Sequence, residues 1–434
     1  MLITKRQSRP IDLDLSPFEV ASRARHLPGM VFFDTAMEKE GGGEISIVAA
    51  VPSLVVEGSS EGDWARLSEA LGARAEERGI EEGIPGGMAA GFVEYGGKFR
   101  FGFYDDLLIY RHGDHCWQEV GNLRSQLAEG GGGVTGKRRP GLVFSAETSE
   151  GEFCEWVRRA QGYISAGDIY QVNLAHRLSA VWEGDPWVFY EALRRYSPAP
   201  HAAYLALAER QIISSSPEHF LKMSGGAVRT RPIKGTRPRR AEVEADSLSA
   251  DDLCNSAKEA AELIMITDLE RNDLGQVCEY GSVSVRELLK LERFEQVFHL
   301  VSTVEGRLRS GVDQVAALRA CFPGGSITGA PKKRAREIIE EIEPSERGVY
   351  TGALGWFGFN GESQFSIAIR TAVVEGGRVH FHVGAGIVAD SVPEAEWQET
   401  LDKAAGILLA GEKMGDAVAG DYLGSEEEPR SVLA

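Results

Sequence analysis

The stretch RTRPIKGTRPR, residues 229–239, contains one lysine among several arginines. In an extended segment the side chains alternate between two faces, so Lys234 points away from Arg229 and Arg231. Lysine, unlike arginine, can lose its proton when it is desolvated and then act as an amine nucleophile. A solvated lysine beside a turn is the simpler interpretation, and the rest of the chain has to decide between the two.

Two pairs of glutamates occur at helical spacing. Glu259 and Glu262 lie in one predicted helix, and Glu396 and Glu399 lie in another. A spacing of three residues puts both carboxylates of a pair on one helix face, where they repel unless a cation joins them. Mg²⁺ prefers a few carboxylates plus water and substrate oxygens, so the two pairs favour a shared magnesium site. Glu399 and Lys403 alone have the spacing of an ordinary surface ion pair.

A glycine-rich turn precedes a predicted helix in FPGGSITGAPKKRAREIIEEI. Free backbone N–H groups and the positive end of the helix dipole predict an anion site there, formed by the glycines with Thr328. Gly324 and Gly329 have the spacing of a nucleotide P-loop. Ala330 and Pro331, however, stand where that loop requires Lys and Ser or Thr, which excludes a kinase or ATPase. The basic residues after the turn have a simpler interpretation as solvated side chains.

The elements that must position these residues are antiparallel strands and separate helices. Residues 349–390 contain three runs rich in β-branched and aromatic residues, separated by Asn-Gly and Gly-Gly, and predict an antiparallel meander. Residues 219–230 predict a further hairpin. Other predicted elements are strands at 44–51 and 98–110 and helices at 152–166, 251–272, 331–343 and 393–410. The sequence therefore predicts an α+β fold, with large antiparallel β-sheets packed in the core and helices outside.

The chain of 434 residues is long enough for one large domain or several ordinary ones. The run from Gly130 to Gly133, followed by VTGKRRPG, is typical of a linker. We therefore expect an N-terminal subregion of mixed strands and helices, 1–130, and a second region, 145–412, that carries the residues described above. Residues 413–434 are polar and acidic and predict a disordered tail.

Composition and charge limit the class of protein. The formal net charge of −18 argues against nucleic acid or an acidic membrane surface as a partner, because both attract cationic faces. No segment approaches the ~20 apolar residues of a membrane span, and the N-terminal residues lack an apolar signal core. The scattered cysteines predict neither a disulfide framework nor a zinc site. We expect a soluble, cytoplasmic protein with five free cysteines, Cys116, Cys154, Cys254, Cys278 and Cys321.

Eight segments of the chain occur in the order and spacing of a known family. They are SPEHFLK, RPIKGTRPR, DLERNDLG, HLVSTVEG, FPGGSITGAPKKRA, YTGALGW, SIAIRT and GAGIVADSVPEAEWQET. In these motifs the chain resembles the chorismate-utilising enzymes, which include aminodeoxychorismate synthase component I, anthranilate synthase component I, isochorismate synthase and salicylate synthase. The resemblance is dense from about residue 150 to 412 and weaker before it. It implies an anthranilate synthase component I-like fold and a chorismate-binding catalytic region at 145–412.

Within this resemblance Lys234 is diagnostic. Sequences similar to aminodeoxychorismate synthase carry Pro-Ile-Lys-Gly-Thr, whereas anthranilate synthases have alanine at the lysine position. The resemblance implies that the Lys234 amine forms a covalent adduct with chorismate. Ammonia then displaces the lysine and gives 4-amino-4-deoxychorismate, for 4-aminobenzoate and folate biosynthesis. Isochorismate and salicylate synthases use a lysine that activates water at the position of Gln171, and a glutamine cannot be that base.

The resemblance also implies roles for the other residues. Glu218 is similar to a general acid that assists hydroxyl departure, which requires a raised pKa. His299 resembles the family's active-site histidine near that leaving group, although a core histidine is the simpler interpretation. The implied Mg²⁺ ligands, direct or through water, are Glu259, Glu262, Glu396 and Glu399. The implied substrate-binding residues are Thr328, Gly329, Tyr350, Arg370, Gly384, Ala385, Gly386, Lys403 and Gln171.

The source of ammonia implies a partner. No cysteine of the chain stands in the Gly-x-Cys-x-Gly setting of a glutamine amidotransferase. We therefore expect a separate glutamine amidotransferase subunit that supplies ammonia. Two alternatives stay open, namely anthranilate synthase component I of tryptophan biosynthesis and a non-catalytic chorismate-binding subunit. Identification of the product made from chorismate, magnesium and ammonium would distinguish them.

Overall fold

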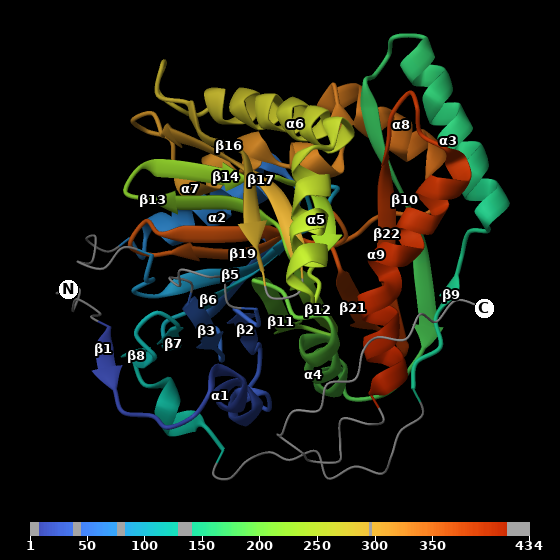
Figure 1. Ribbon diagram of the computed structural model, residues 1–434. Coiled ribbons are helices and arrows are strands. Elements are labelled where there is room, and N and C mark those ends of the chain that lie inside the picture. The colour runs from blue at the N-terminus through green and yellow to red at the C-terminus, as the bar shows by residue number, and fades with distance from the viewer. Residues whose placement is uncertain (1–7, 38–44, 76–82, 129–140, 295–296, 415–434) are drawn as a thin grey trace.

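The computed structural model describes residues 8–37, 45–75, 83–128, 141–294 and 297–414. In these residues two large β-sheets form the centre of the molecule, and helices lie outside them (Figure 1). All the pairings that build the sheets are antiparallel. The predicted α+β fold is therefore confirmed. The predicted linker and, after Met414, the predicted tail lie outside the described residues.

The first sheet combines strands from the whole length of the chain. It has 12 described strands, one of which, β9, pairs only with β10. In spatial order they are β1 (Arg9–Ile11), β8 (Cys116–Val120), β7 (Leu107–Arg111), β3 (Ile45–Ala49), β2 (Val31–Asp34), β11 (His201–Leu207), β12 (Arg210–Ser216), β21 (Thr371–Glu375), β22 (Arg378–Ile387), β10 (Gln171–Val181) and β18 (Gly329–Ala330), with β9 (Ser145–Ala146) beside β10.

The second sheet is built in the same way and has 10 described strands. In spatial order they are β15 (Ile233–Pro238), β17 (Val297–Arg307), β14 (Ala227–Arg231), β13 (His219–Ser224), β20 (Ser363–Ile367), β19 (Ala353–Gly358), β5 (Met88–Val93), β6 (Phe99–Tyr104) and β4 (Leu54–Gly58), with β16 (Ser284–Arg293) beside β17. The predicted hairpin at 219–230 is confirmed as β13 and β14.

The described helices cover the outer faces of the sheets. They are α1 (Pro17–Ala24), α2 (Glu61–Gly72), α3 (Glu150–Ser165), α4 (Pro186–Tyr196), α5 (Val243–Cys254), α6 (Ala257–Gly275), α7 (Gln314–Cys321), α8 (Lys332–Ile342) and α9 (Pro393–Lys413), with short 3₁₀ helices η1 (Leu123–Gln126) and η2 (Gly325–Ile327). Three predicted helices correspond to α3, α8 and α9. In the part of the chain that the structure describes, no helix is both long and apolar enough to cross a membrane.

The single helix predicted at 251–272 is wrong, because two helices meet there. α5 ends at Cys254, where the Asn255 side chain donates a hydrogen bond to the Asp251 carbonyl oxygen. Ser256 then caps α6, and its hydroxyl accepts a hydrogen bond from the N–H of Glu259. Serine is a strong helix N-cap, so it starts a new helix where periodicity alone predicts continuation. This break places Glu259 in the first turn of α6.

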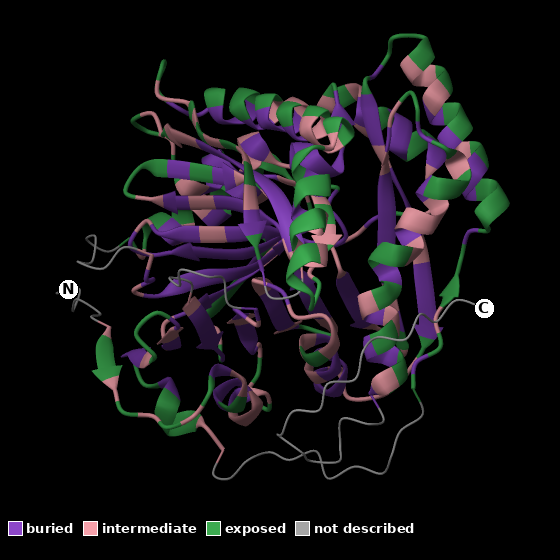
Figure 2. Ribbon diagram, viewed as in Figure 1, coloured by how far each residue is buried: buried purple, intermediate pink, exposed green. Residues whose placement is uncertain are grey.

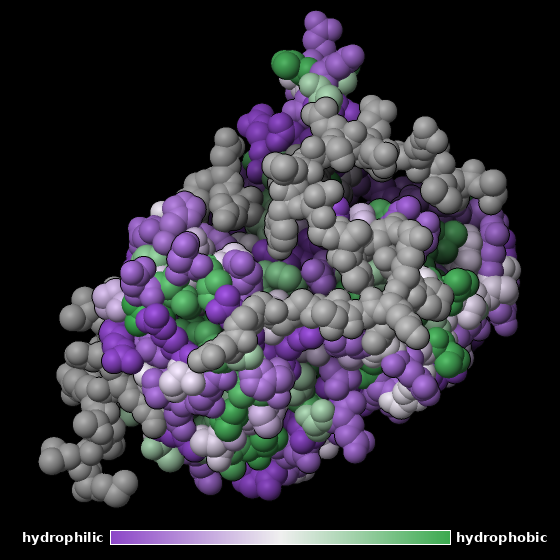
Figure 3. All heavy atoms as spheres, turned by 90° about the horizontal axis from the view of Figure 1, so that it is seen from below, coloured by the Kyte–Doolittle hydropathy of each residue, from purple (hydrophilic) through white to green (hydrophobic). Residues whose placement is uncertain are grey.

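An apolar layer between the two sheets forms the centre of the core. Val31 and Ile212 of the first sheet belong to the same buried cluster as Met88 and Trp356 of the second. Figure 2 shows that the central strands are mostly buried, whereas the helices expose their outer sides. Figure 3 shows small apolar groups among hydrophilic residues on one outer face, as expected for a water-exposed surface.

The predicted meander at 349–390 is also wrong in one respect. The second of its three runs contains two strands, β20 and β21, which belong to different sheets. The chain passes from one sheet to the other at Ala368 to Arg370, and Arg370 has a positive φ of 48°. Another passage, from β12 to β13, occurs at Pro217 and Glu218. The two passages lie together, because the Ile367 N–H donates a hydrogen bond of 3.1 Å to the Glu218 carbonyl oxygen.

Candidate active site

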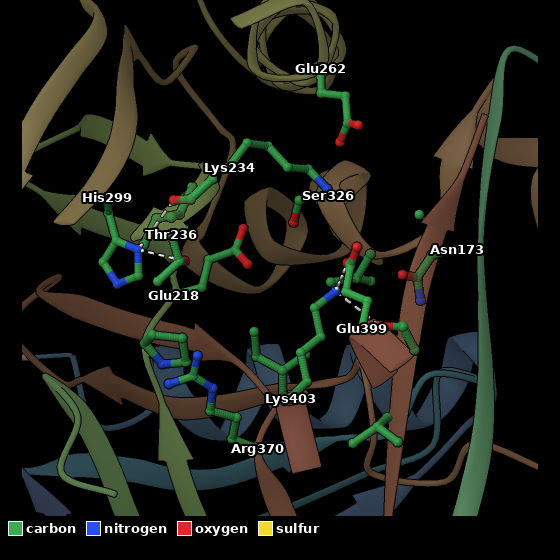
Figure 4. Close-up of a pocket in the computed structure, with 18 of the residues that line it drawn as sticks. Asn173, Glu218, Lys234, Thr236, Glu262, His299, Ser326, Arg370, Glu399 and Lys403 are labelled. Atoms are coloured by element: carbon green, nitrogen blue, oxygen red, sulfur yellow. Dashed lines mark hydrogen bonds and ion pairs between the residues drawn. The ribbon is translucent and has the colours of Figure 1, made fainter. Parts of the chain in front are cut away.

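A cavity of about 540 Å³ lies beside these two passages (Figure 4). Its wall includes residues of β10 and β22 from the first sheet and of β15 and β17 from the second. Helices α6 and α9 and the turn η2 complete it. The cavity therefore gathers side chains from segments that are far apart in the sequence.

Lys234 extends from β15 into this cavity (Figure 4). β15 pairs with β17, and the register shifts between Lys234 and Thr236. Such a bulge turns the neighbouring side chain and strengthens the local twist. Arg229 and Arg231 form ion pairs with other carboxylates and do not line the cavity. Lys234 is separated from these basic neighbours as predicted, but not by alternation along one strand, because Arg229 and Arg231 belong to β14, which β17 separates from β15.

The Lys234 amine lies near two carboxylates. Figure 4 shows it reaching between Glu262 on one side and Ser326 and Glu218 on the other. The positive charge of Lys234 lowers the pKa of both carboxyl groups and so opposes the effect of their burial. The Lys234 amine makes no hydrogen bond or ion pair with any residue that the structure describes. It is therefore available to a bound molecule.

Glu218 occupies the passage between β12 and β13 and is only 6% exposed. Burial raises the pKa of this carboxyl group. The Ser326 hydroxyl, which forms a hydrogen bond with it, and the Lys234 amine act in the opposite direction but do not cancel the effect. A carboxyl group that keeps its proton at higher pH can serve as a general acid.

His299 lies on β17, and its Nδ1 atom is 3.0 Å from the Thr236 hydroxyl oxygen and 3.4 Å from the Gly235 carbonyl oxygen. Burial, together with the nearby Arg370 guanidinium, lowers the pKa of His299 to about 4. The imidazole is therefore neutral near pH 7. A neutral imidazole can form a hydrogen bond at each nitrogen, but it supplies no positive charge.

Arg370 stands at the passage between β20 and β21. Its carbonyl oxygen accepts a hydrogen bond of 3.0 Å from the N–H of Ser215 on β12, which supports the positive φ. Burial lowers the pKa of its guanidinium. Among the residues that the structure describes, no carboxylate pairs with this cation. A partly buried guanidinium with no counter-ion is suited to bind a carboxylate of a ligand.

Tyr350 lies beside β22, with its ring stacked on that of His382 at a centroid distance of 5.3 Å. Burial raises the pKa of Tyr350 to about 12, so its hydroxyl keeps its proton and can donate a hydrogen bond. His382, Gly384 and Gly386 alternate along β22 and all line the cavity. The two glycines leave this part of the wall open to a ligand.

Three of the predicted metal ligands reach the cavity, Glu259 and Glu262 from α6 and Glu399 from α9. Burial raises the pKa of Glu262, and the negative charges of Glu259 and Glu399 add to the effect. Burial also acts on Glu399, but its ion pair with Lys403, at 2.7 Å, brings the pKa of Glu399 below its ordinary value. Lys403 also donates a hydrogen bond of 3.0 Å to the Gly384 carbonyl oxygen.

The donor set of this wall fits a magnesium ion. Within the described ranges, no three acidic or histidine side chains converge closely enough to hold a metal by themselves. Mg²⁺, however, binds through one or two carboxylates and completes its shell with water and substrate oxygens. Glu262 makes no ion pair with a described residue, and a cation would favour its charged form. Glu262 and Glu399 are therefore the side chains that would hold the ion.

Comparison with known proteins decides the family. The family model of chorismate binding enzymes matches residues 92–409. The chain belongs to this family. The match begins earlier than the dense resemblance at about residue 150, since it includes the end of β5 and all of β6, which join the second sheet through the pairing of β5 with β19.

Curated relatives of two kinds are similar to this chorismate binding enzyme. Aminodeoxychorismate synthase component 1 of Bacillus subtilis (strain 168) is 47% identical over 261 residues, which are 60% of this chain and 56% of that protein. Anthranilate synthase component 1 3 of Haloarcula marismortui is 46% identical over 287 residues, which are 66% of this chain and 57% of that protein. The matched part thus spans little more than half the length of these relatives.

Solved structures share the fold of this chorismate binding enzyme. Anthranilate synthase component I from Streptococcus pneumoniae TIGR4 superimposes with a TM-score of 0.75 at 29% identity, over 86% of this chain and 93% of that chain. MenF, the menaquinone-specific isochorismate synthase from Escherichia coli, has a TM-score of 0.75 at 19% identity, over 93% of this chain and 94% of that chain. The second likeness concerns the fold alone.

Most of the predicted site residues of this chorismate binding enzyme line one cavity, and five do not. Thr328 is fully buried and its hydroxyl donates to the Gly324 carbonyl oxygen. Gln171 packs behind the wall, where a Cβ added to Gly386 would lie 2.5 Å from its amide nitrogen. The predicted residues outside the lining are Gln171, Thr328, Gly329, Ala385 and Glu396. Their roles toward a ligand stay predictions.

Sequence reasoning missed several residues that line the cavity. Ser326 stands in the quoted motif FPGGSITGAPKKRA, but the pattern does not tell which hydroxyl of the turn faces inward. Asn173 and His382 lie on strands whose apolar alternation indicates packing rather than binding. The motif could have drawn attention to Ser326, whereas no local signal marks Asn173 or His382.

Proposed function

We propose that this chain converts chorismate and ammonia to 4-amino-4-deoxychorismate. The observation that carries the proposal is the unpaired Lys234 amine inside the cavity, with Glu218 beside it and Arg370 further along the wall (Figure 4). A primary amine, a buried carboxylic acid and a cation for the substrate's carboxylate are the groups that this reaction needs.

The proposed reaction has two steps, addition of Lys234 to chorismate and displacement of the lysine by ammonia. Lys234 Nζ, as a free amine, attacks ring carbon 2 of chorismate, both ring double bonds shift, and the bond from carbon 4 to its hydroxyl breaks. Glu218 gives a proton to the departing hydroxyl, which leaves as water. Ammonia then attacks carbon 4, both double bonds shift back, and the lysine nitrogen leaves carbon 2. The proton that the new amine loses restores the Glu218 carboxyl group. The sum is chorismate plus ammonia giving 4-amino-4-deoxychorismate plus water.

The substrate's two carboxylates require cations. Arg370, with the proton donor Tyr350, is suited to the enolpyruvyl carboxylate, because its guanidinium has no counter-ion among the described residues. Glu262 and Glu399 would hold a magnesium ion, which supplies positive charge for the ring carboxylate when it is bound. Neutral His299 offers a hydrogen bond near the departing hydroxyl.

A separate glutaminase subunit is the proposed source of ammonia. The relatives that support this partner carry the name component 1. The chain's own five cysteines are free, and three of them, Cys154, Cys278 and Cys321, are buried. A buried thiol with a raised pKa is a poor nucleophile, and burial raises the pKa of all three.

Anthranilate synthesis is the second candidate, because anthranilate synthase relatives are as similar as aminodeoxychorismate synthase relatives. In that reaction ammonia itself would add at carbon 2, and no lysine adduct would form. Lys234 favours the first candidate, since anthranilate synthases have alanine at this position.

The deciding experiment is product analysis with chorismate, magnesium chloride and ammonium salt. We expect the wild type to form 4-amino-4-deoxychorismate and Lys234→Ala to lose or divert this product. Lys290→Ala is the matched control, because Lys290 lies on β16 of the same sheet, is half exposed and does not line the cavity. Anthranilate as the wild-type product would replace the first candidate with the second.

A further inference from the structure

A buried carboxylate of helix α6, that of Glu270, forms a hydrogen bond with the glycine-rich turn. Glu270 is 3% exposed and accepts hydrogen bonds from the N–H of Gly325, at 3.0 Å, and from the hydroxyl of Thr230, at 3.3 Å. The turn lies so close to α6 that a Cβ added to Gly325 would be 2.5 Å from a Leu269 methyl group. The sequence predicts that this turn binds an anion. The N–H of Gly325 binds the chain's own Glu270 carboxylate instead of a ligand.

The next residue of the turn reaches the candidate active site. Ser326 follows Gly325 directly and lines the cavity beside Glu218 (Figure 4). As a hydrogen-bond donor, its hydroxyl lowers the pKa of the Glu218 carboxyl group. A continuous series of contacts therefore runs from Glu270 through the Gly325 backbone and the Ser326 side chain to Glu218. Thr230, the other partner of Glu270, is on β14, two residues before Pro232, where the chain breaks between β14 and β15.

Glu270 does not stand alone in this buried region. Asp273, one turn further along α6 and also 3% exposed, forms an ion pair with Lys332 of α8. Lys332 is thus not solvated, contrary to the simpler interpretation of the basic residues after the turn. Burial and the charge of Asp273 raise the pKa of Glu270. Asp273 gives a matched control, because it shares the buried cluster but forms its hydrogen bond with Lys332 and not with Gly325, whose N–H bonds to Glu270.

We propose that Glu270 is a positioning residue for the reaction: its carboxylate holds the Gly325–Ser326 turn so that the Ser326 hydroxyl stays on the carboxyl group of Glu218. The proposal rests on the proposed function for its kinetic consequence. Its structural part, the hydrogen bond by which Glu270 holds the Gly325–Ser326 turn, does not depend on which product the chain forms. Glu270 acts through Ser326 and does not itself line the cavity.

A double-mutant cycle tests the kinetic part. The rate of chorismate consumption is measured for the wild type, Glu270→Gln, Ser326→Ala and the double variant. We expect each single substitution to lower kcat about tenfold with little change in KM, because each removes a hydrogen bond that positions the Glu218 carboxyl group. In the Ser326→Ala background, Glu270→Gln should lower kcat less than about threefold, because both changes remove one chain of contacts. Independent, fully additive effects overturn the proposal.

Hydrogen exchange of the peptide that contains residues 322–331 tests the structural part without any turnover. Glu270→Gln should speed exchange there, whereas Asp273→Asn should leave this peptide closer to the wild type while it lowers stability. If Glu270→Gln does not fold, Glu270→Asp, which keeps the charge but shortens the side chain, should speed exchange in the same peptide. Unchanged exchange in the folded Glu270 variants overturns the proposal. A wild type that consumes no chorismate contradicts the proposed function, and the exchange result still decides this inference.

Discussion

At the scale of residues, burial decides which groups around Lys234 carry a proton. It raises the pKa of Glu218 and lowers that of His299 to about 4. As a general acid, Glu218 works only in its protonated form, so the rate should fall as the pH rises through its raised pKa. A fall of kcat on the alkaline side of the pH profile follows.

Substitution of the two groups should affect this profile differently. We expect Glu218→Gln to remove the alkaline limb and to lower kcat by about 10²- to 10⁴-fold, the usual contribution of a general acid. His299→Gln should keep the limb, because a histidine with a pKa of about 4 does not change its charge at higher pH. Rates of chorismate loss between pH 5 and 9 provide the measurement. If the alkaline limb persists in Glu218→Gln, a group other than Glu218 causes it.

At the scale of elements, one buried arginine joins the segments that carry the site. Arg347 donates hydrogen bonds to the carbonyl oxygens of Asn173 on β10, at 2.6 Å, and Ile327 in η2, at 3.1 Å. It also forms an ion pair with Glu343 at the end of α8, at 2.6 Å. Both side chains of the pair are less than 5% exposed. Arg347 therefore fixes the spacing between a strand, a turn and a helix.

We expect Arg347→Leu to lower the free energy of unfolding by about 3–5 kcal/mol, because it leaves the buried Glu343 carboxylate without a counter-ion. The double variant Arg347→Leu with Glu343→Leu should lose less than the sum of the single losses. Urea unfolding of the four proteins gives the comparison. Arg66→Leu is the control, since its ion pair with Asp63 is exposed and such pairs contribute at most about 1 kcal/mol. A loss for Arg347→Leu no larger than that of the control would show that the pair is not structural.

At the scale of the whole molecule, the two parts of the chain on either side of residue 130 share both sheets. β2 pairs with β11 in the first sheet, and β5 pairs with β19 in the second. The expected subregions 1–130 and 145–412 therefore do not correspond to separate sheets. Each central pairing joins an early strand to a late one, so neither part has a complete sheet of its own.

A fragment that begins at residue 141 should consequently fail to fold. It would expose the edges of β11 and β19 and lose one side of the core between the sheets, and long exposed edges promote aggregation. The whole chain should unfold in one transition, with the same midpoint by tryptophan fluorescence and by far-ultraviolet circular dichroism. A soluble fragment with native secondary structure, or two separate transitions of the whole chain, would contradict this expectation.

The sequence by itself determined the local features of this protein. Gly376 and Gly377 supply the positive φ of the β21–β22 hairpin, and β13 and β14 form the hairpin predicted at 219–230. These features depend on neighbouring residues only, so periodicity and turn chemistry reveal them. The ordered motifs in turn pointed to the chorismate binding enzymes, and the family match bears this out.

Only the tertiary structure decided which of these features meet. It placed β20 and β21 in different sheets, and so put Arg370 and Glu218 in the wall of one cavity. In the folded chain the N–H of Gly325 donates a hydrogen bond to Glu270. Ser326, and not Thr328, lines the cavity. The physical reason is that partners of buried polar groups come from distant segments, because each donor must be satisfied by whatever packing brings within reach. No local pattern contains that information.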